Sequence, residues 1–372
     1  MHKFNSRKAV AIVVVLLAVV IASGCGKLGS GKVKGSDLPE VYVGMAGVEA
    51  VFAPETVPSV TTSGSQADVL LFLSNKGAID ADMTDDSLIV VVRDQSGAFQ
   101  FMPNVLKGTE VASLLPAGSE SKTQGKLLGK ASTSTAGSLE PIEIKAVATG
   151  FEQSKEAIDT GLMASICYKY ATKLTANVCI DDLSYSFQKQ RKPCDAKVPV
   201  AFTKGQGAPV AVKKIETITE KSGTAIRPKF KIYIGNVGKG FVIDKDSIHL
   251  FCTDKKERIV DKLNKVQIDY VELLNGKQLA CNQNQLTLTG SAANDFVICS
   301  YNYDDFSEGM GTFATPLKVE LSYGYTSTSN PIPVKVEKGI QCEEGAERSC
   351  SITGGGGGTQ KCIDSHWTFC QK

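Results

Sequence analysis

Apolar and polar residues alternate along many short segments of this 372-residue chain. Residues 142–147 (IEIKAV) show the alternation clearly, and residues 47–52 (GVEAVF) show it again. A period of two places every second side chain on one face of a strand. Gly, Pro, Asn and Ser separate these segments, and long stretches with helical periodicity are missing from the sequence. The pattern predicts an all-β fold of short strands joined by turns.

One stretch occurs twice, at residues 72–80 (FLSNKGAID) and 233–241 (YIGNVGKGF). In each copy an apolar run enters an Asn-x-Gly turn. An acidic loop then leads into Asp-Ser and a second apolar run, at residues 86–94 and 246–254. Gly and Asn reach positive φ at low cost, which suits a tight turn between antiparallel strands. Each copy therefore predicts a β-hairpin around its turn.

The similarity extends over two long segments that carry strand patterns in the same order. Copy 1 covers residues 39–192 and copy 2 covers residues 208–338, with residues 193–207 as a linker. Self-similarity over a whole domain indicates duplication. Short strands at regular spacing predict two tandem immunoglobulin-like β-sandwiches. The repeated strand pair resembles that of CARDB-type and other immunoglobulin-like domains of archaeal and bacterial surface proteins, and this resemblance implies a surface role.

Two tyrosines occupy alternate positions near the end of each copy, in the matching segments 166–172 and 319–327. Alternate positions place both side chains of a pair on one face of their strand. We expect them in the core, and the alternative is a contact surface. The four residues are Tyr168, Tyr170, Tyr323 and Tyr325.

The first 25 residues are typical of an export signal, with basic residues before an apolar run at 9–22. This run is shorter than the roughly 20 residues that span a bilayer. The following Ala22-Ser-Gly-Cys25 resembles a lipobox, although Ala22 replaces the usual Leu. The resemblance implies cleavage before Cys25 and a lipid on its thiol, and the alternative is an uncleaved apolar anchor. Residues 26–38, rich in Gly, Ser and Lys, are typical of a flexible linker.

Charge and cysteine content limit the cellular compartments and the classes of partner that suit this chain. Lys and Arg number 41 against 39 for Asp and Glu, so the net charge of +2 gives no general attraction to nucleic acid. Setting Cys25 aside leaves ten of the eleven cysteines, an even number that permits five disulfides in an oxidising compartment. These candidates are Cys167, Cys179, Cys194, Cys252, Cys281, Cys299, Cys342, Cys350, Cys362 and Cys370.

Only some pairings are indicated by the strand pattern. Cys167 and Cys179 flank residues 168–178, where we predict two hairpin strands around a loop, and opposed strands bring cysteines to bonding distance. Cys252 is expected to pair with Cys299 or Cys281. Cys194 has no local mate in the sequence, so one pair is expected to join distant segments.

Residues 339–372 form a small module rich in cysteine and glycine. Its spacing is similar to that of Cys-rich modules appended to bacterial and archaeal surface proteins, which implies disulfides in one of three connectivities. Cys362, His366 and Cys370 would share one face of a helix and bind zinc if the segment were helical, which its sequence does not favour. Trp367 and Phe369 are expected either to pack on a disulfide or to serve as exposed binding anchors.

Catalytic motifs are missing from the sequence. The histidines are His2, His249 and His366, and none lies near a nucleophile motif. We expect His249 on the solvated face of a strand. Residues 80–86 carry four aspartates (Asp80, Asp82, Asp85 and Asp86) that would suit Ca²⁺, although a solvated loop is the simpler interpretation. No catalytic residue, metal or cofactor is predicted.

These observations predict a non-enzymatic, lipid-anchored cell-surface protein that serves adhesion, recognition or envelope structure. Its partners would be the membrane, through the anchor, and a protein or glycan outside the cell, but not nucleic acid. One alternative is a solute-binding lipoprotein of a transporter, which predicts two α/β lobes. The other is an enzyme with an unrecognised carboxylate site, which requires two acids in one pocket.

Overall fold

The computed structural model describes the chain from residue 42 onward, with gaps. The described ranges are 42–108, 125–131, 136–149, 155–182, 192–252, 260–273, 276–291, 293–303, 305–307, 309–339, 343–352, 356–363, 366–368 and 370–371. The export signal, Cys25 and the linker at 26–38 lie outside them. Residues Asp37–Lys372 form one compact unit. In the ranges given above, no helix is long and apolar enough to cross a membrane.

Strands dominate both copies, as the alternating pattern predicted, and the all-β fold class is confirmed. Copy 1 contains β1 (Val48–Phe52), η2 (Pro54–Thr56), β2 (Val60–Thr62), β3 (Gln66–Asn75), β4 (Ala81–Asp82), β5 (Leu88–Asp94), β6 (Phe99–Met102), β7 (Val105–Lys107), β8 (Lys126–Leu127), β9 (Leu139–Ala148) and β10 (Ala157–Asp181).

The linker and copy 2 follow with β11 (Val200–Ala201), β12 (Val210–Ser222), β13 (Ala225–Asn236), β14 (Phe241–Ile243), η4 (Lys245–Ser247), α3 (Ile248–Cys252), η5 (Val260–Lys262), β15 (Lys265–Leu273), β16 (Ala280–Cys281), β17 (Gln285–Thr287), β18 (Phe296–Ser300), β19 (Thr312–Thr328) and β20 (Ile332–Glu337). The C-terminal module is a small sheet of β21 (Glu347–Ile352), β22 (Gly356–Ile363) and β23 (His366–Trp367).

Each copy has an outer sheet of its own, and both share a central sheet. The outer sheets have the strand orders β1-β3-β9-β6 and β11-β12-β13-β18-β16. The central sheet has the order β17-β15-β19-β10-β20-β2, and β5, β7 and β14 also belong to it. Buried side chains from both copies form one continuous hydrophobic cluster. The copies therefore share a core as well as a sheet.

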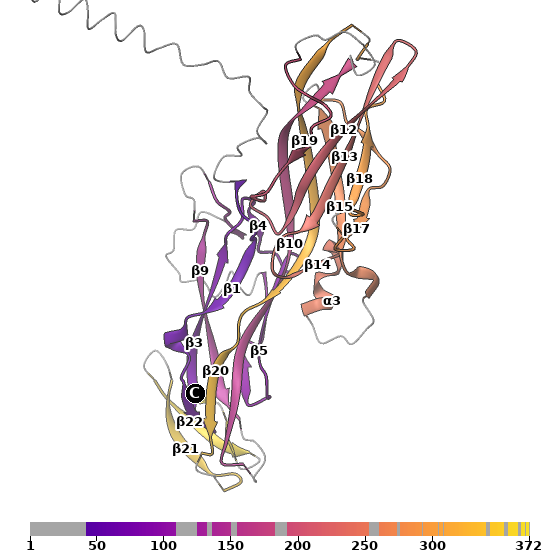
Figure 1. Cartoon of the computed structure of the whole chain (residues 1–372). Coiled ribbons are helices and arrows are strands. Elements are labelled where there is room, and N and C mark those ends of the chain that lie inside the picture. Colours follow the sequence, from indigo (N-terminus) through magenta and orange to yellow (C-terminus); the bar gives the residue numbers. More distant parts are fainter. Residues whose placement is uncertain are drawn as a thin grey trace, which may run out of the picture. The chain divides into compact units, whose positions relative to one another are not determined.

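Strands β10 and β19 run antiparallel at the centre (Figure 1). Tyr168 lies opposite Tyr325, and Tyr170 lies opposite Tyr323. In the repeat, Tyr168 corresponds to Tyr323 and Tyr170 corresponds to Tyr325. Each tyrosine therefore lies opposite the counterpart of the other tyrosine on its own strand, as a local two-fold axis requires. The axis passes between Lys169 and Gly324, which are also paired. The duplicated halves are related as the subunits of a symmetric dimer would be.

The predicted hairpin within residues 166–180 was wrong, because β10 is one continuous strand of 25 residues. Its second half alternates buried and exposed side chains without a break and pairs with β19 throughout. In turn β20, which closes copy 2 in the sequence, pairs with β10 and β2 of copy 1. Each copy therefore contributes its last segment to the other.

The hairpin predicted around each Asn-x-Gly turn was also wrong. β3 pairs with β1 and β9 in the outer sheet, whereas β5 pairs with β10 and β7 in the central sheet. The turn thus carries the chain from one sheet to the other, and copy 2 repeats this crossing from β13 to β14. Residues 88–92 are buried at every position, which is typical of a central strand and not of a hairpin edge.

The run at 246–254 is not a strand at its start. Residues Lys245–Ser247 form a 3-10 turn, which continues into α3. The Asp244 carboxylate accepts a hydrogen bond from the Asp246 amide (2.9 Å), so the acidic residue acts as an N-terminal cap. His249 therefore lies on a short helix, and its predicted place on a strand face was wrong.

Candidate functional surfaces

A tyrosine closes the Asn-x-Gly turn of copy 1. The Asn75 side-chain oxygen accepts hydrogen bonds from the Gly77 amide (3.0 Å) and the Tyr170 hydroxyl (3.1 Å). The Asn75 side-chain amide donates to the carbonyl of Ile79 (2.8 Å). The hydroxyl also lies 2.9 Å from the Ile79 carbonyl oxygen. We call this arrangement the corner of copy 1.

Copy 2 repeats the corner with equivalent atoms. Asn236 accepts from the Gly238 amide (3.1 Å) and from the Tyr325 hydroxyl (3.3 Å), and donates to the Gly240 carbonyl (2.8 Å). The Gly240 amide donates to the same hydroxyl (2.7 Å). The corner therefore accounts for the sequence repeat, because Asn and Gly are both needed at its hydrogen-bonded turn.

Glycine at each corner is required by space and not by a positive φ, which neither Gly77 nor Gly238 adopts. A Cβ atom on Gly77 would overlap the hydroxyl of Tyr170, and one on Gly238 would overlap that of Tyr325. The turn and the tyrosine therefore constrain each other across the two sheets.

The remaining two tyrosines are also buried, so the core prediction is confirmed for all four. Tyr168 hydrogen-bonds the backbone of Val48, where β1 begins. Tyr323 accepts from the amide of Val210, where β12 begins (3.4 Å), and bonds the Thr172 hydroxyl (3.0 Å). Burial raises the pKa of Tyr168 and of Tyr323 well above the ordinary value. These hydroxyls hold the architecture together, so they are unavailable to a partner.

The disulfides connect different cysteines from those predicted. Cys167 bonds Cys252, Cys179 bonds Cys194, and Cys281 bonds Cys299. The Cys167–Cys179 pairing was wrong because both lie on β10, where 12 residues at about 3.3 Å each put them roughly 40 Å apart. The pairing of Cys252 with Cys299 or Cys281 was wrong as well. Cys194 does have a local mate, Cys179, 15 residues away, so the expectation for Cys194 was wrong. The long-range pair is instead Cys167–Cys252, which spans 85 residues and joins the two copies.

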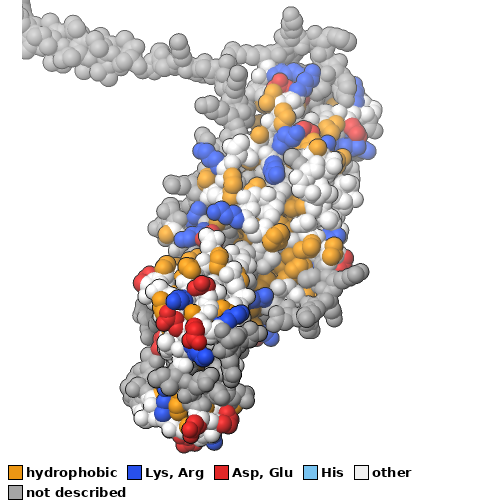
Figure 2. Space-filling view, turned by 60° about the horizontal axis from the view of Figure 1, so that its bottom comes forward, with side chains coloured by type: hydrophobic (Ala, Val, Ile, Leu, Met, Phe, Trp, Pro, Cys, Tyr) orange, Lys and Arg blue, Asp and Glu red, His pale blue; other side chains and the backbone are white. Residues whose placement is uncertain are grey.

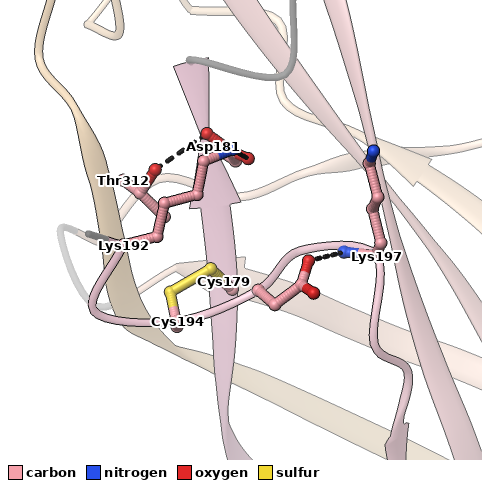
Figure 3. The surroundings of a disulfide bond; sticks show 7 residues. Cys179, Asp181, Lys192, Cys194, Lys197 and Thr312 are labelled. Carbon is pink, nitrogen blue, oxygen red and sulfur yellow. Dashed lines mark hydrogen bonds and ion pairs between the residues drawn. A yellow bond between two sulfur atoms is a disulfide. The ribbon is translucent and has the colours of Figure 1, made fainter. Parts of the chain in front are cut away.

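The Cys179–Cys194 disulfide ties the linker to the end of β10 (Figure 3). Beside it the buried carboxylate of Asp181 accepts a hydrogen bond from Thr312 (2.8 Å) and pairs with the ammonium group of Lys192. These contacts join the linker, β10 and β19. The surroundings of this disulfide are those of a structural link.

The acidic residues after the first Asn-x-Gly turn take part in local contacts. Asp80 accepts a hydrogen bond from the Gly129 amide (2.9 Å), and Asp82 lies 3.9 Å from the ammonium of Lys126 on the surface. Among the residues that the structure describes, no group of three His, Cys, Asp or Glu side chains is placed to hold a metal ion. The Ca²⁺ interpretation of this loop therefore gains no support.

The C-terminal module is held by a Cys350–Cys370 disulfide, and Cys362 is disulfide-bonded too. Bonded sulfurs provide no thiolate, so these cysteines cannot form the zinc site considered above, and the segment is not helical. Cys342 and Phe369 lie outside the described residues.

Trp367 is half-buried. The guanidinium of Arg348 lies 4.4 Å from the centre of its ring and donates to Gln360 (2.9 Å). A Cβ on Gly64 would lie 3.6 Å from the ring, so Trp367 also rests against the turn between β2 and β3. A binding role for Trp367 stays a prediction.

The outward face of the copy 2 outer sheet combines aromatic and basic side chains. Tyr233 on β13 packs against Phe296 on β18, with 5.6 Å between ring centres. The ammonium of Lys214 lies 4.1 Å from the Tyr233 ring centre, and that of Lys231 lies 3.9 Å from the Phe296 ring centre. We call this the basic–aromatic face. Figure 2 shows basic, acidic and hydrophobic side chains interspersed over one side of the molecule.

Glu216 orders this face further. It lies 2.6 Å from the ammonium of Lys214 and accepts from the Tyr233 hydroxyl (3.0 Å). The hydrogen bond with Lys214 lowers the pKa of Glu216 and raises that of Lys214. The face thus holds its charges in defined positions.

Copy 1 presents different side chains at the equivalent positions. The strand registers match Phe72 with Tyr233 and Pro141 with Phe296. Four basic residues on the outward face of β12 and β13 have no basic counterpart in copy 1. Lys214, Arg227, Lys229 and Lys231 correspond to Val51, Gln66, Asp68 and Leu70.

A groove of about 460 Å³ adjoins the basic–aromatic face. The two are adjacent because the groove residue Ile298 lies opposite Lys231, and the groove residue Lys229 lies two positions before Lys231 on β13. Polar side chains dominate the rest of its lining, which is formed by Glu220, Arg227, Ala280, Cys281, Asn282, Ser300 and Asn302.

A second depression, of about 290 Å³, is lined by residues of β5 and β6 and by Asn104, Val105 and Cys252. Its carboxylate, Asp94, accepts from the Ala98 amide (2.7 Å) and bonds Ser96. In the groove, Glu220 pairs with Lys229 (2.6 Å). Neither depression brings two carboxylates together in its described lining, as a glycosidase-type site would require.

Comparison with known proteins identifies no family. No protein-family model matches the chain, and no curated protein matches its sequence. The YadV chaperone matches with 10% identity and a TM-score of 0.17, over 77% of this chain and 98% of its own. The C-terminal domain of the Streptococcus pyogenes antigen I/II-family protein AspA matches with 6% identity and a TM-score of 0.16, over 79% and 99%.

The secreted serine protease VesC from Vibrio cholerae matches with 9% identity and a TM-score of 0.17, over 79% of this chain and 52% of its own. Scores this low carry no argument about the fold or the function of this chain. The outer faces and the groove therefore have to be interpreted from their own chemistry.

Proposed function

We propose that this protein is exported, anchored by a lipid on Cys25, and displays its duplicated β-fold outside the membrane as a non-enzymatic recognition or adhesion protein. The observation that carries the proposal is the buried Cys167–Cys252 disulfide between the two copies. Buried disulfides between distant segments persist in an oxidising compartment. Residues 1–25 carry the basic residues, apolar run and lipobox-like end of an export signal, which would direct the chain to such a compartment.

The recognition role rests on the difference between the two copies. Their corners and buried tyrosines coincide, whereas their outward faces differ in charge and in aromatic content. A rigid, cross-linked scaffold with one distinctive face suits the display of a binding surface. The transporter alternative predicts two α/β lobes, and the all-β fold lacks that architecture.

Anchoring is tested by mass spectrometry of the chain purified from membranes. We expect the mature protein to begin at Cys25 and to carry the mass of a lipid. The variant Cys25→Ser should lose the lipid, while Ser30→Ala in the linker, as a matched control, should keep it. An unmodified thiol on a chain that retains its leader would contradict the anchoring proposal.

Recognition is tested by adding the labelled protein to whole cells and measuring bound label. We expect saturable binding that replacement of Tyr233 and Lys231 by Ala weakens and replacement of Phe72 and Leu70 by Ala in copy 1 leaves unchanged. Equal loss from both pairs of substitutions would show that the effect comes from stability and not from the face.

A further inference from the structure

The ammonium groups of the basic–aromatic face are held in place before any ligand arrives. Lys231 lies between two rings, 3.9 Å from the centre of Phe296 and 4.9 Å from that of Tyr233. Lys214 lies over the other ring and is fixed by Glu216. Cation–π contacts restrict these flexible side chains. A ligand that binds them therefore loses less conformational entropy than it would on free lysines.

The adjoining groove supplies hydrogen-bonding groups at the same surface. Its volume of about 460 Å³ lies within the range of small-ligand sites. Asn282 is fixed there by a hydrogen bond from the Ile298 amide (2.9 Å), and Ser300 and Asn302 line the groove beside it. Amides and hydroxyls of this kind form hydrogen bonds with ligands that carry many hydroxyl groups.

We propose that the groove and the basic–aromatic face together bind an acidic polysaccharide. Its carboxylate or sulfate groups would pair with Lys231 and Lys214, and its hydroxyls would bond Asn282, Ser300 and Asn302. Four basic residues against two acidic ones supply the charge complementarity. The inference rests on the proposed function only in placing this face outside the cell.

An acidic peptide is the less favoured ligand for this surface. Peptides commonly bind by adding a strand to the edge of a sheet. The side chains of the groove and of the basic–aromatic face lie on the outward face of the sheet, whereas strand addition uses the backbone along its edge. The polar groove beside fixed positive charges matches a hydroxyl-rich polyanion better.

The direct test measures binding of the full chain, in detergent, to four immobilised polymers. Heparin offers sulfate, polygalacturonate offers carboxylate, dextran is neutral, and poly-glutamate is an acidic peptide. We expect the protein to bind at least one of the two acidic polysaccharides, and this binding should weaken as salt rises. Stronger binding to heparin would identify sulfate as the recognised group, and stronger binding to polygalacturonate would identify carboxylate. Equal binding to poly-glutamate or to dextran, or no binding to either acidic polysaccharide, would overturn the proposal.

The residue test uses Lys231→Met, which removes the charge and keeps the length of the side chain. We expect affinity to fall about tenfold, and Asn302→Ala to weaken it about threefold. Leu70→Met, at the equivalent position of copy 1, should leave affinity unchanged. So should Lys335→Met, which removes an exposed lysine from a pair with Glu337.

Equal losses from Lys231→Met and Lys335→Met would mean that only net charge matters, and the site would be rejected. Thermal melts of all four variants separate lost binding from lost folding. If whole cells still bind the protein while neither acidic polysaccharide does, the ligand class is wrong and the proposed recognition function stands. If cells do not bind it but heparin or polygalacturonate does, the ligand class stands and the proposed recognition of cells is wrong.

Discussion

The corner at Asn75 and the corner at Asn236 have the same hydrogen bonds in different surroundings. Asn75 is fully buried and also donates to the Leu127 carbonyl (2.9 Å) in the segment that carries β8. Asn236 is exposed. The same geometry thus forms with and without a covering segment, so the corner depends on its own Asn, Gly and Tyr and not on burial.

The outward sheet faces differ far more than the corners do. In copy 1 the row across the sheet is Val51, Phe72 and Pro141, and in copy 2 it is Lys214, Tyr233 and Phe296. Residues in the corners and the core are constrained by packing on several sides. Outward residues are not, so the duplicated fold leaves one face of each copy available for different chemistry.

The largest loss of stability is expected at alkaline pH. Burial raises the pKa of Tyr168, Tyr170 and Tyr323, so the unfolded chain loses these protons first. Their contribution to stability is complete below the ordinary value of about 10 and is lost as pH rises above it. One pH unit above that value, each of these tyrosines should lower the free energy of unfolding by about 1.4 kcal/mol.

The measurement follows tyrosinate absorbance and circular dichroism during an alkaline titration. Ionisation of the buried tyrosines should coincide with unfolding in both copies. Ionisation of all the tyrosines near pH 10 with the strands intact would show that they are not held neutral by the fold.

Removing the disulfide between the copies should cost about 4 kcal/mol of unfolding free energy, because it closes a long loop. The variant replaces Cys167 and Cys252 by Ala, and urea unfolding measures the loss. The shorter Cys281–Cys299 loop is the comparison, with an expected loss of about 3 kcal/mol. Since the shared sheet remains, we expect a single transition. Two separate transitions would mean that the disulfide alone couples the copies.

Adding one methyl group at either corner should cost about 3 kcal/mol, because the new Cβ would overlap a tyrosine hydroxyl. The variants are Gly77→Ala and Gly238→Ala, compared by thermal unfolding. Gly357→Ala is the control, since a Cβ there meets open space. A neutral effect at one corner only would break the equivalence of the two.

Removing the corner hydroxyls should separate the buried corner from the exposed one. Tyr170→Phe leaves the buried Asn75 with one partner fewer and should cost about 2 kcal/mol. Tyr325→Phe should cost about 1 kcal/mol, because water can replace the hydroxyl at the exposed Asn236. Unfolding in urea measures both losses, and a larger loss at Tyr325 would reverse the comparison.

Local patterns predicted the strands but not their partners. The alternation at 142–147 correctly places a strand there, and the continuous burial at 88–92 is readable as an apolar run. The Asn-x-Gly before that run is a hairpin signal and predicts a hairpin there. Asn and Gly do form a hydrogen-bonded turn, but without the positive φ expected of a hairpin loop, and this turn carries the chain between sheets.

The basic–aromatic face was missed because its residues lie on three strands. Phe296 is far from Lys214 and Tyr233 in the chain, and nothing in the sequence shows that its strand is a neighbour of theirs. Their only signal is that Tyr233 aligns with Phe72 inside the repeat, with a basic residue at Lys231 in place of Leu70. A comparison of the two copies position by position would have found that change of charge.

The sequence by itself indicated a repeated β-rich unit, predicted most of the strand segments, and favoured the core for the four tyrosines. Only the tertiary structure decided that the copies share one sheet, which cysteines meet, and which outward side chains lie together. The reason is that alternation reports how deeply each side chain is buried. Backbone hydrogen bonds are alike in every strand, so the choice of neighbour depends on how the whole chain packs.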